Sequence, residues 1–279
     1  SMNYKAVLAL LLLIPVFSAY GAKPADVTVR SELQNNDTYQ FYGSNPAIIP
    51  QFLVLDFPSL VNLAPSAPLP FTILLEPGAT DVPLLSLKAV KEGRISYSSR
   101  YTFAQGNPDA VHDDTHLYLF PFAHGTKHLV TQGNRGAFTH FDDNTYAFDF
   151  DLDTGTPVHA ARRGLVVEVK EDSNRGGPGA SYNNDANYIL VMHDDGSFGN
   201  YVHLRQNGAE VSIGDQVEAG QLLGYSGNTG RSSGPHLHFD VRMPNRNGMM
   251  SSIPITFLGH DGKAVQAADQ AAGLTRQLL

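Results

Sequence analysis

Short apolar runs separated by turn-forming residues are the feature that most constrains how this chain can fold. Between residues 23 and 122 such runs recur, for example at 51–55, 71–75 and 116–120, and Pro or Gly clusters lie between them. The 279 residues include 26 Gly and 17 Pro, and long amphipathic helices are hard to find. Because short runs bounded by turn signals are typical of sheet strands, the sequence predicts a mostly β chain.

The character of the sequence changes after about Thr126. The segment 23–122 has no motif associated with chemistry, and its evenly spaced runs predict a β-sandwich accessory domain of roughly 100 residues. From 123 to 260 Gly, His and Asp are dense, and sharper strand-like runs such as 187–192 predict a second β domain. The tail at 261–279 is rich in Ala and Gln, a composition that suits a short helix.

The N-terminal residues have the layout of a secretory signal peptide. Lys5 supplies a positive charge, residues 6–17 are apolar, and small residues that suit cleavage follow. The apolar run is well short of the ~20 residues that a membrane-spanning helix needs. We therefore assign residues 1–22 to a signal peptide and expect an exported protein with no stable membrane span after its removal.

Charge and cysteine content exclude several classes of function. The formal net charge is −8 and no Lys/Arg cluster is present, so a nucleic-acid partner is not expected. The chain has no cysteine, which excludes disulfides, a thiol nucleophile and a zinc site built from thiolates.

The pair His236-Leu237-His238 is the strongest local signal of chemistry. Residues i and i+2 of a strand point to the same face, so two imidazoles would project side by side from one sheet surface. Imidazole is the commonest metal ligand and suits proton transfer near neutral pH. The pair alone does not distinguish a metal or catalytic site from two surface histidines on an edge strand.

Further candidates lie elsewhere in the second domain. His203 ends a strand-like run, and His140 and Asp149 lie in the segment 139–150. Alternation in 146–150 predicts Tyr146, Phe148 and Phe150 in the core, which leaves Asp149 on the opposite face. A catalytic zinc ion takes three nitrogen, oxygen or sulfur ligands from the protein and keeps one position open, and imidazole with carboxylate fits that requirement.

Together these segments resemble the M23 family of peptidoglycan endopeptidases, the lysostaphin and LytM-like group. The resemblance covers 124–258, nearly half of the chain, with several motifs in the order of the family. The matching stretches are YAFD at 146–149, YVHL at 201–204, GDQVEAGQ at 214–221, SGNTG at 226–230 and GPHLHF at 234–239. It implies a LytM-like antiparallel β-sheet metallopeptidase domain after the N-terminal β-sandwich.

The resemblance also implies a role for each candidate residue. Asp149 and His238 correspond to zinc ligands, and His203 and His236 to the catalytic histidines. The family usually has a histidine four residues before the aspartate, where this sequence has Thr145, so His140 is the expected substitute ligand.

The function that the resemblance implies is zinc-dependent (Zn2+) hydrolysis of peptide cross-links in bacterial peptidoglycan. The expected partner is the peptide stem, and the acidic composition without a basic wall-binding module favours a periplasmic enzyme that cuts D-Ala–diaminopimelate bonds. The alternative is a catalytically silent LytM-like protein that binds peptidoglycan or activates an amidase. Such proteins commonly lack the site residues, which are present here.

The remaining histidines show no convergent pattern. His112 and His116 have the i, i+4 spacing of a helical metal pair, but their segment is polar and favours a solvated turn. We assign His124, His128, His159, His193 and His260 to the surface.

Overall fold

The computed structural model describes residues 26–34, 37–132 and 142–266. Within them the chain forms two compact units. The first contains residues up to Pro108 together with 246–249, and the second contains 109–245 and the residues from Met250 onward. The proposed signal peptide, His140 and residues 267–279 of the tail lie outside the described residues.

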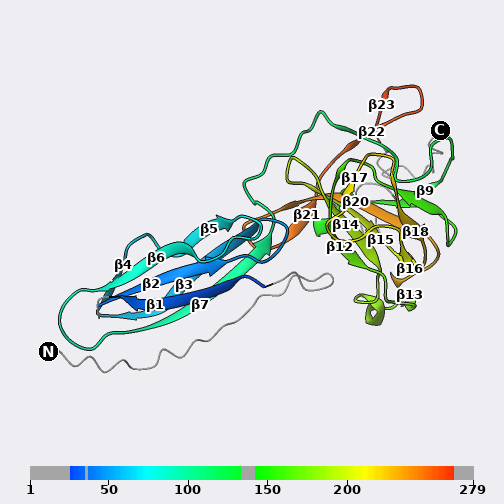
Figure 1. Ribbon diagram of the computed structural model, residues 1–279. Helices are drawn as coiled ribbons and strands as arrows, with labels where there is room; N and C mark the ends of the chain where they lie inside the picture. The colour runs from blue at the N-terminus through cyan, green and yellow to red at the C-terminus, as the bar shows by residue number, and fades with distance from the viewer. Residues whose placement is uncertain (1–25, 35–36, 133–141, 267–279) are drawn as a thin grey trace. The chain divides into compact units, whose positions relative to one another are not determined.

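Two antiparallel sheets form the first unit, blue to cyan-green in Figure 1. One has the order β1 (Thr28–Gln34), β2 (Thr38–Ser44), β6 (Val82–Ala89) and β4 (Leu63–Pro65). The other has the order β5 (Phe71–Leu75), β3 (Gln51–Val61) and β7 (Ser96–Gln105).

The two sheets of the first unit share an apolar core. Phe41 of β2 contacts Phe57 of β3 and Tyr97 of β7 edge-on, with ring centroids 5.0 and 5.5 Å apart. Leu55, Leu85 and other alternating residues of both sheets join the same cluster. Alternate burial along each strand therefore explains why the short runs of the sequence pack as two layers.

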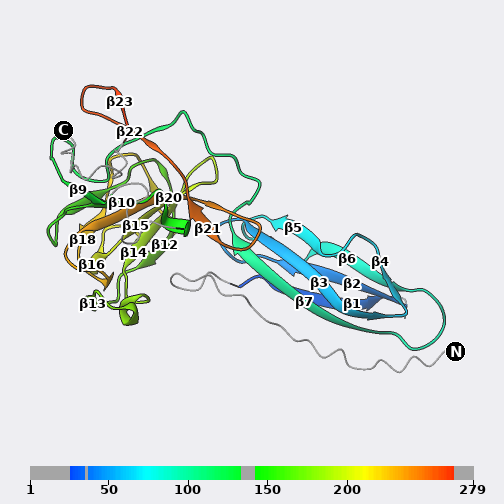
Figure 2. The ribbon, with the colours of Figure 1, turned by 180° about the vertical axis from the view of Figure 1, so that it is seen from behind.

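An eight-stranded sheet is the centre of the second unit. Its order is β17 (Gln216–Val217), β12 (Gly164–Lys170), β14 (Tyr188–Met192), β15 (Phe198–Val202), β20 (Leu237–Pro244), β10 (Phe148–Phe150) and β9 (Val130–Gln132), and β21 (Met250–Ser252) pairs with β20. β20 lies between β15 and β10 and pairs antiparallel with both. Figure 2 shows β10 and β20 from behind.

Smaller elements complete the second unit. Its other sheets are β11 (Pro157–His159) with β18 (Leu222–Ser226) and β16 (Leu204–Ala209), β13 (Gly176–Gly177) with β19 (Gly230–Arg231), and β23 (Ala264–Val265) with β22 (Thr256–Leu258) and β8 (Leu117–Tyr118). Two 3-10 turns are present among the described residues, η1 (Asp142–Asn144) and η2 (Ala180–Tyr182). The predicted tail helix is not supported at 264–265, which form β23.

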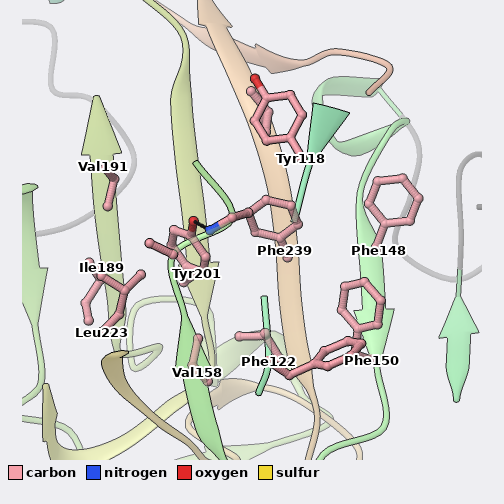
Figure 3. Close-up of a cluster of buried hydrophobic side chains, with 14 of the residues drawn as sticks. Tyr118, Phe122, Phe148, Phe150, Val158, Ile189, Val191, Tyr201, Leu223 and Phe239 are labelled. Carbon is pink, nitrogen blue, oxygen red and sulfur yellow. Dashed lines mark hydrogen bonds between the residues drawn. The ribbon is translucent and has the colours of Figure 1, made fainter. Parts of the chain in front are cut away.

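Aromatic side chains fill the core beneath the large sheet. Phe148 and Phe150 of β10, Tyr201 of β15 and Phe239 of β20 are fully buried and lie together in Figure 3. The hydroxyl of Tyr201 accepts a hydrogen bond from the backbone N–H of Ala161 at 2.8 Å. Burial of each aromatic ring contributes about 1.5–3 kcal/mol, so this core fixes the strands that carry the site. Tyr146, which we predicted in the core, is only half-buried.

The boundary between the units differs from our prediction at 122/123. Tyr118 and Phe122 are buried in the core of the second unit, and Tyr118 lies in β8, which pairs in parallel with β22. The run 116–120 has the local pattern of a strand in either domain. Its partner lies about 140 residues later in the sequence, so local pattern could not assign it.

The fold class is confirmed as mostly β. Among the described residues, none of the helices is long and apolar enough to cross a membrane.

Candidate active site

Strand pairing brings Asp149 and His238 together. In β20, Leu237, Phe239 and Val241 face the core, so the alternate residues face the other side of the sheet. Asp149 of β10 lies directly opposite His238. Oδ1 of Asp149 is 2.9 Å from Nδ1 of His238, and both side chains are about one-tenth exposed. We call this side of the eight-stranded sheet the site face.

His203 and His236 lie beside this pair. The ring centroid of His203 is 4.6 Å from that of His236 and 6.0 Å from that of His238. Nε2 of His236 is 3.8 Å from Oδ1 of Asp149. The structure therefore brings together four of the five predicted site residues, which come from β10, from the junction of β15 with β16, and from β20 and the residue before it.

Backbone carbonyls fix the orientation of both catalytic candidates. Nδ1 of His203 is 2.6 Å from the carbonyl oxygen of Thr229, and Nδ1 of His236 is 2.8 Å from that of Gly234. A carbonyl oxygen only accepts, so Nδ1 carries the proton in each ring. Nε2 of each neutral ring is then left with a lone pair that can take a proton.

Two opposite pKa shifts occur within the cluster. Burial and the neighbouring imidazoles of His236 and His238 lower the pKa of His203 to about 3, so this ring is neutral near pH 7. Burial lowers the pKa of His238, but the hydrogen bond and charge of Asp149 outweigh it and raise that pKa above its ordinary value.

The donor atoms of Asp149 and His238 suit zinc. A carboxylate oxygen and an imidazole nitrogen bind zinc at about 2.0–2.2 Å, so two ligands of one ion lie roughly 3 Å apart, as Oδ1 and Nδ1 do here. Within the described part of the chain, no three His, Asp or Glu side chains form a group that could hold a metal ion. His140, the third predicted ligand, lies outside that part.

A buried polar network on the site face was missed by the sequence analysis. Asp240 accepts hydrogen bonds from Nδ2 of Asn200 at 2.9 Å and from Nε of Arg242 at 2.6 Å. Arg242 also donates to Oδ1 of Asn144 at 2.6 Å, which holds η1 against β20. The signal was available, because Asp240 and Arg242 continue the i, i+2 spacing of His238 in an otherwise apolar run.

Two histidines that we assigned to solvated positions are buried. His112 bonds to the hydroxyl of Tyr118 through Nε2 at 3.0 Å, and its side chain is 8% exposed. His193 is 2% exposed and lies 2.8 Å from Oγ of Ser197. Burial and the charge of Arg162 lower the pKa of His193 to about 3. Both assignments were wrong. The hydrogen-bond partners are close in sequence, but the burial depends on a distant contact, because Tyr118 also lies edge-on to the ring of His193 with ring centroids 5.8 Å apart.

Known proteins resemble the part of the chain that carries this site. Residues 143–250, most of which lie in the second unit, match the model of Peptidase family M23. Glycyl-glycine endopeptidase ALE-1 of Staphylococcus capitis is 36% identical over 120 residues, which are 43% of this chain and 30% of that protein. Peptidoglycan DD-endopeptidase ShyA of Vibrio cholerae is 35% identical over 109 residues, which are 38% of this chain and 23% of that protein.

Among solved structures, the catalytic domain of the antimicrobial peptidase lysostaphin from Staphylococcus simulans is 28% identical. The match covers 50% of this chain and 87% of that chain, with a TM-score of 0.31. The matched segment of our chain spans less than a third of the length of the two curated relatives. His140 lies outside the residues that match the family model.

Proposed function

We propose that this protein is a zinc-dependent endopeptidase that hydrolyses peptide cross-links of bacterial peptidoglycan. The observation that carries the proposal is the convergence of Asp149, His203, His236 and His238 within the segment that matches Peptidase family M23. The two relatives named above are an endopeptidase of glycyl-glycine bonds and a peptidoglycan DD-endopeptidase, which supports this class of substrate.

The residues divide into two chemical roles. Asp149 and His238 would hold the ion, with His140 as the third ligand. The chemistry that zinc would supply when bound there is a lowered pKa of a water molecule and polarisation of the scissile carbonyl. Whichever of the two rings, His203 or His236, is neutral would accept a proton from the water on its Nε2. The other ring, when protonated, donates from Nε2 to the developing oxyanion or to the leaving amine.

We further propose D-Ala–diaminopimelate as the bond that is cut and the periplasm as the location. The formal net charge of −8 and the likeness to a peptidoglycan DD-endopeptidase support this choice. Residues 1–22 would direct export. N-terminal sequencing of the protein from a periplasmic fraction tests export, and an intact N-terminus or retention in the cytoplasm would contradict it.

Mass spectrometry of the fragments released from purified sacculi tests the activity. We expect the full chain with zinc to convert cross-linked dimers that contain diaminopimelate into monomers, and a chelator to stop the reaction. His203→Ala and His236→Ala should lose the activity. His159→Ala is a matched control, because its Nδ1 also contacts a backbone carbonyl, that of Gly220 at 2.7 Å, outside the site.

The outcomes separate the competing functions. Cleavage only of sacculi with glycine bridges would contradict the proposed bond and leave the endopeptidase in place. Binding to sacculi without release of any fragment would overturn the enzyme and favour a silent peptidoglycan-binding or amidase-activating protein.

A further inference from the structure

His203 has an unusual backbone conformation for the place it occupies. Its φ angle is +68°, in the left-handed region that few residues other than glycine adopt. It is the single residue between β15, which ends at Val202, and β16, which begins at Leu204. A residue in this conformation persists only where the surrounding structure holds it, so its neighbours decide where the imidazole points.

The support for His203 comes from Asn187, a side chain with no exposed surface. Its backbone carbonyl accepts the N–H of Leu204 at 3.2 Å, and its Nδ2 donates to the carbonyl of Leu204 at 3.3 Å. Its amide also exchanges two hydrogen bonds with the backbone of Ser173, at 2.8 and 3.0 Å. Asn187 thus fixes the residue that follows His203 to the start of the 171–186 segment.

Thr229 connects this support to the imidazole. Its hydroxyl accepts the backbone N–H of Asn187 at 2.9 Å and donates to the carbonyl of Leu204 at 2.7 Å. Its own carbonyl accepts the proton of Nδ1 of His203 at 2.6 Å. Thr229 is 6% exposed, so loss of its hydroxyl would leave two buried backbone groups without that partner.

Neighbouring residues restrict Thr229 further. The next residue, Gly230, has a φ angle of +79°, and a Cβ there would lie 2.5 Å from the side chain of Ala186. Gly230 also lies in β19, which pairs in parallel with β13. The backbone of Thr229 is therefore fixed in two ways. Its hydroxyl bonds to the backbone of Asn187 and Leu204, and the residue that follows it belongs to the pair of β19 with β13.

We infer that Thr229 and Asn187 are positioning residues that hold His203 as the Nδ1–H tautomer, with the lone pair of Nε2 directed toward the site. The hydroxyl of Thr229 sets the place of its carbonyl, and the carbonyl selects which ring nitrogen carries the proton. The effect on turnover rests on the proposed function, whereas the tautomer itself does not.

The test compares three variants of the full, zinc-loaded chain. Thr229→Val removes the hydroxyl at nearly constant volume, and Thr229→Ser keeps it. Ser226→Ala is the matched control, because Oγ of this fully buried serine also joins two backbone groups, those of Asp153 and Thr156, but none next to His203. Imidazole nitrogen NMR reports the tautomer of His203, identified by the signal lost in His203→Ala.

In Thr229→Val we expect His203 to lose its single Nδ1–H tautomer, with unchanged bound zinc. The kcat of this variant for peptide cross-links should fall about 10- to 100-fold, while its KM stays similar. A loss of this size is typical when a hydrogen-bond partner that orients a functional side chain is removed. Thr229→Ser should restore both properties, and Ser226→Ala should lower thermal stability while it leaves the tautomer intact.

An unchanged His203 tautomer in Thr229→Val would overturn the inference, as would equal losses of kcat in Thr229→Val and Ser226→Ala. Asn187→Ser supplies the same comparison if Thr229→Val does not fold. If the unaltered chain releases no peptidoglycan fragments, the proposed function fails, and the NMR comparison still decides the inference.

Discussion

Replacement of the buried carboxylate Asp240 by an amide should destabilise the second unit by about 3–5 kcal/mol. Asp240 has no exposed surface, and it accepts hydrogen bonds from Asn200 and from Arg242, whose side chain is 9% exposed. In Asp240→Asn the guanidinium of Arg242 stays buried and loses the charge that Asp240 places 2.6 Å from its Nε. Removal of one partner from a buried ion pair typically costs about 3–5 kcal/mol.

Calorimetry of the full chain measures this loss. A domain of about 150 residues loses about 2–4 °C in Tm for each kcal/mol, so the transition of the second unit should fall by about 6–20 °C. Asp56→Asn is the control in the first unit, because Asp56 pairs with Arg100 at 2.7 Å where both side chains are more exposed, at 27% and 62%. An exposed pair contributes about 0–1 kcal/mol.

Equal, small shifts in the two variants would refute the reasoning, because they would show that burial adds nothing to the ion pair of Asp240. A second variant checks the cause. Asp240→Leu combined with Arg242→Met removes both charges, and it should recover part of the stability that Asp240→Asn loses.

Three further predictions follow from single residues. Gly230→Ala should lower the Tm more than Gly214→Ala. The φ angle is positive at both glycines, but only at Gly230 would the added methyl group meet a neighbouring side chain, that of Ala186. Equal losses of Tm in the two variants would contradict this. Burial raises the pKa of Asp195, but hydrogen bonds from Ser197 and the backbone and the charge of Arg162 hold it below its ordinary range. The stability from Asp195 is therefore present at neutral pH and lost as the pH falls below about 4. In Asp195→Asn the Tm should fall less steeply below this pH than in the unaltered chain. An equally steep fall in both proteins would contradict the prediction. His203→Ala should keep its zinc and lose about 10²–10⁴-fold in hydrolysis, whereas His238→Ala should lose the metal, and full activity in His236→Ala would contradict the assignment of that residue.

Local patterns were sufficient to predict the faces of the strands that carry the site. Period-two alternation placed Phe148 and Phe150 in the core and Asp149 on the opposite face, as the structure has them. The same period placed His238 away from the core. That Asp149 lies opposite His238 depends on register between strands about 90 residues apart, and this came from the resemblance to the M23 family rather than from the pattern.

Features that depend on distant contacts could not be predicted. The positive φ of His203 has no signal in the sequence, because it follows from the hydrogen bonds of Asn187 and Thr229 with Leu204. Tyr118 was placed in the wrong domain for the same reason, since its strand partner is β22. In each case the deciding contact joins segments that no local rule connects.

The central claim is that Asp149 and His238 hold zinc while His203 and His236 do not. An anomalous difference map at the zinc edge, from crystals of the full chain grown with zinc, tests it most directly. We predict one peak within about 2.0–2.2 Å of a carboxylate oxygen of Asp149 and of Nδ1 of His238, with His140 as the third protein ligand. A peak bonded to a nitrogen of His203 or His236, or no peak beside Asp149, would contradict the account.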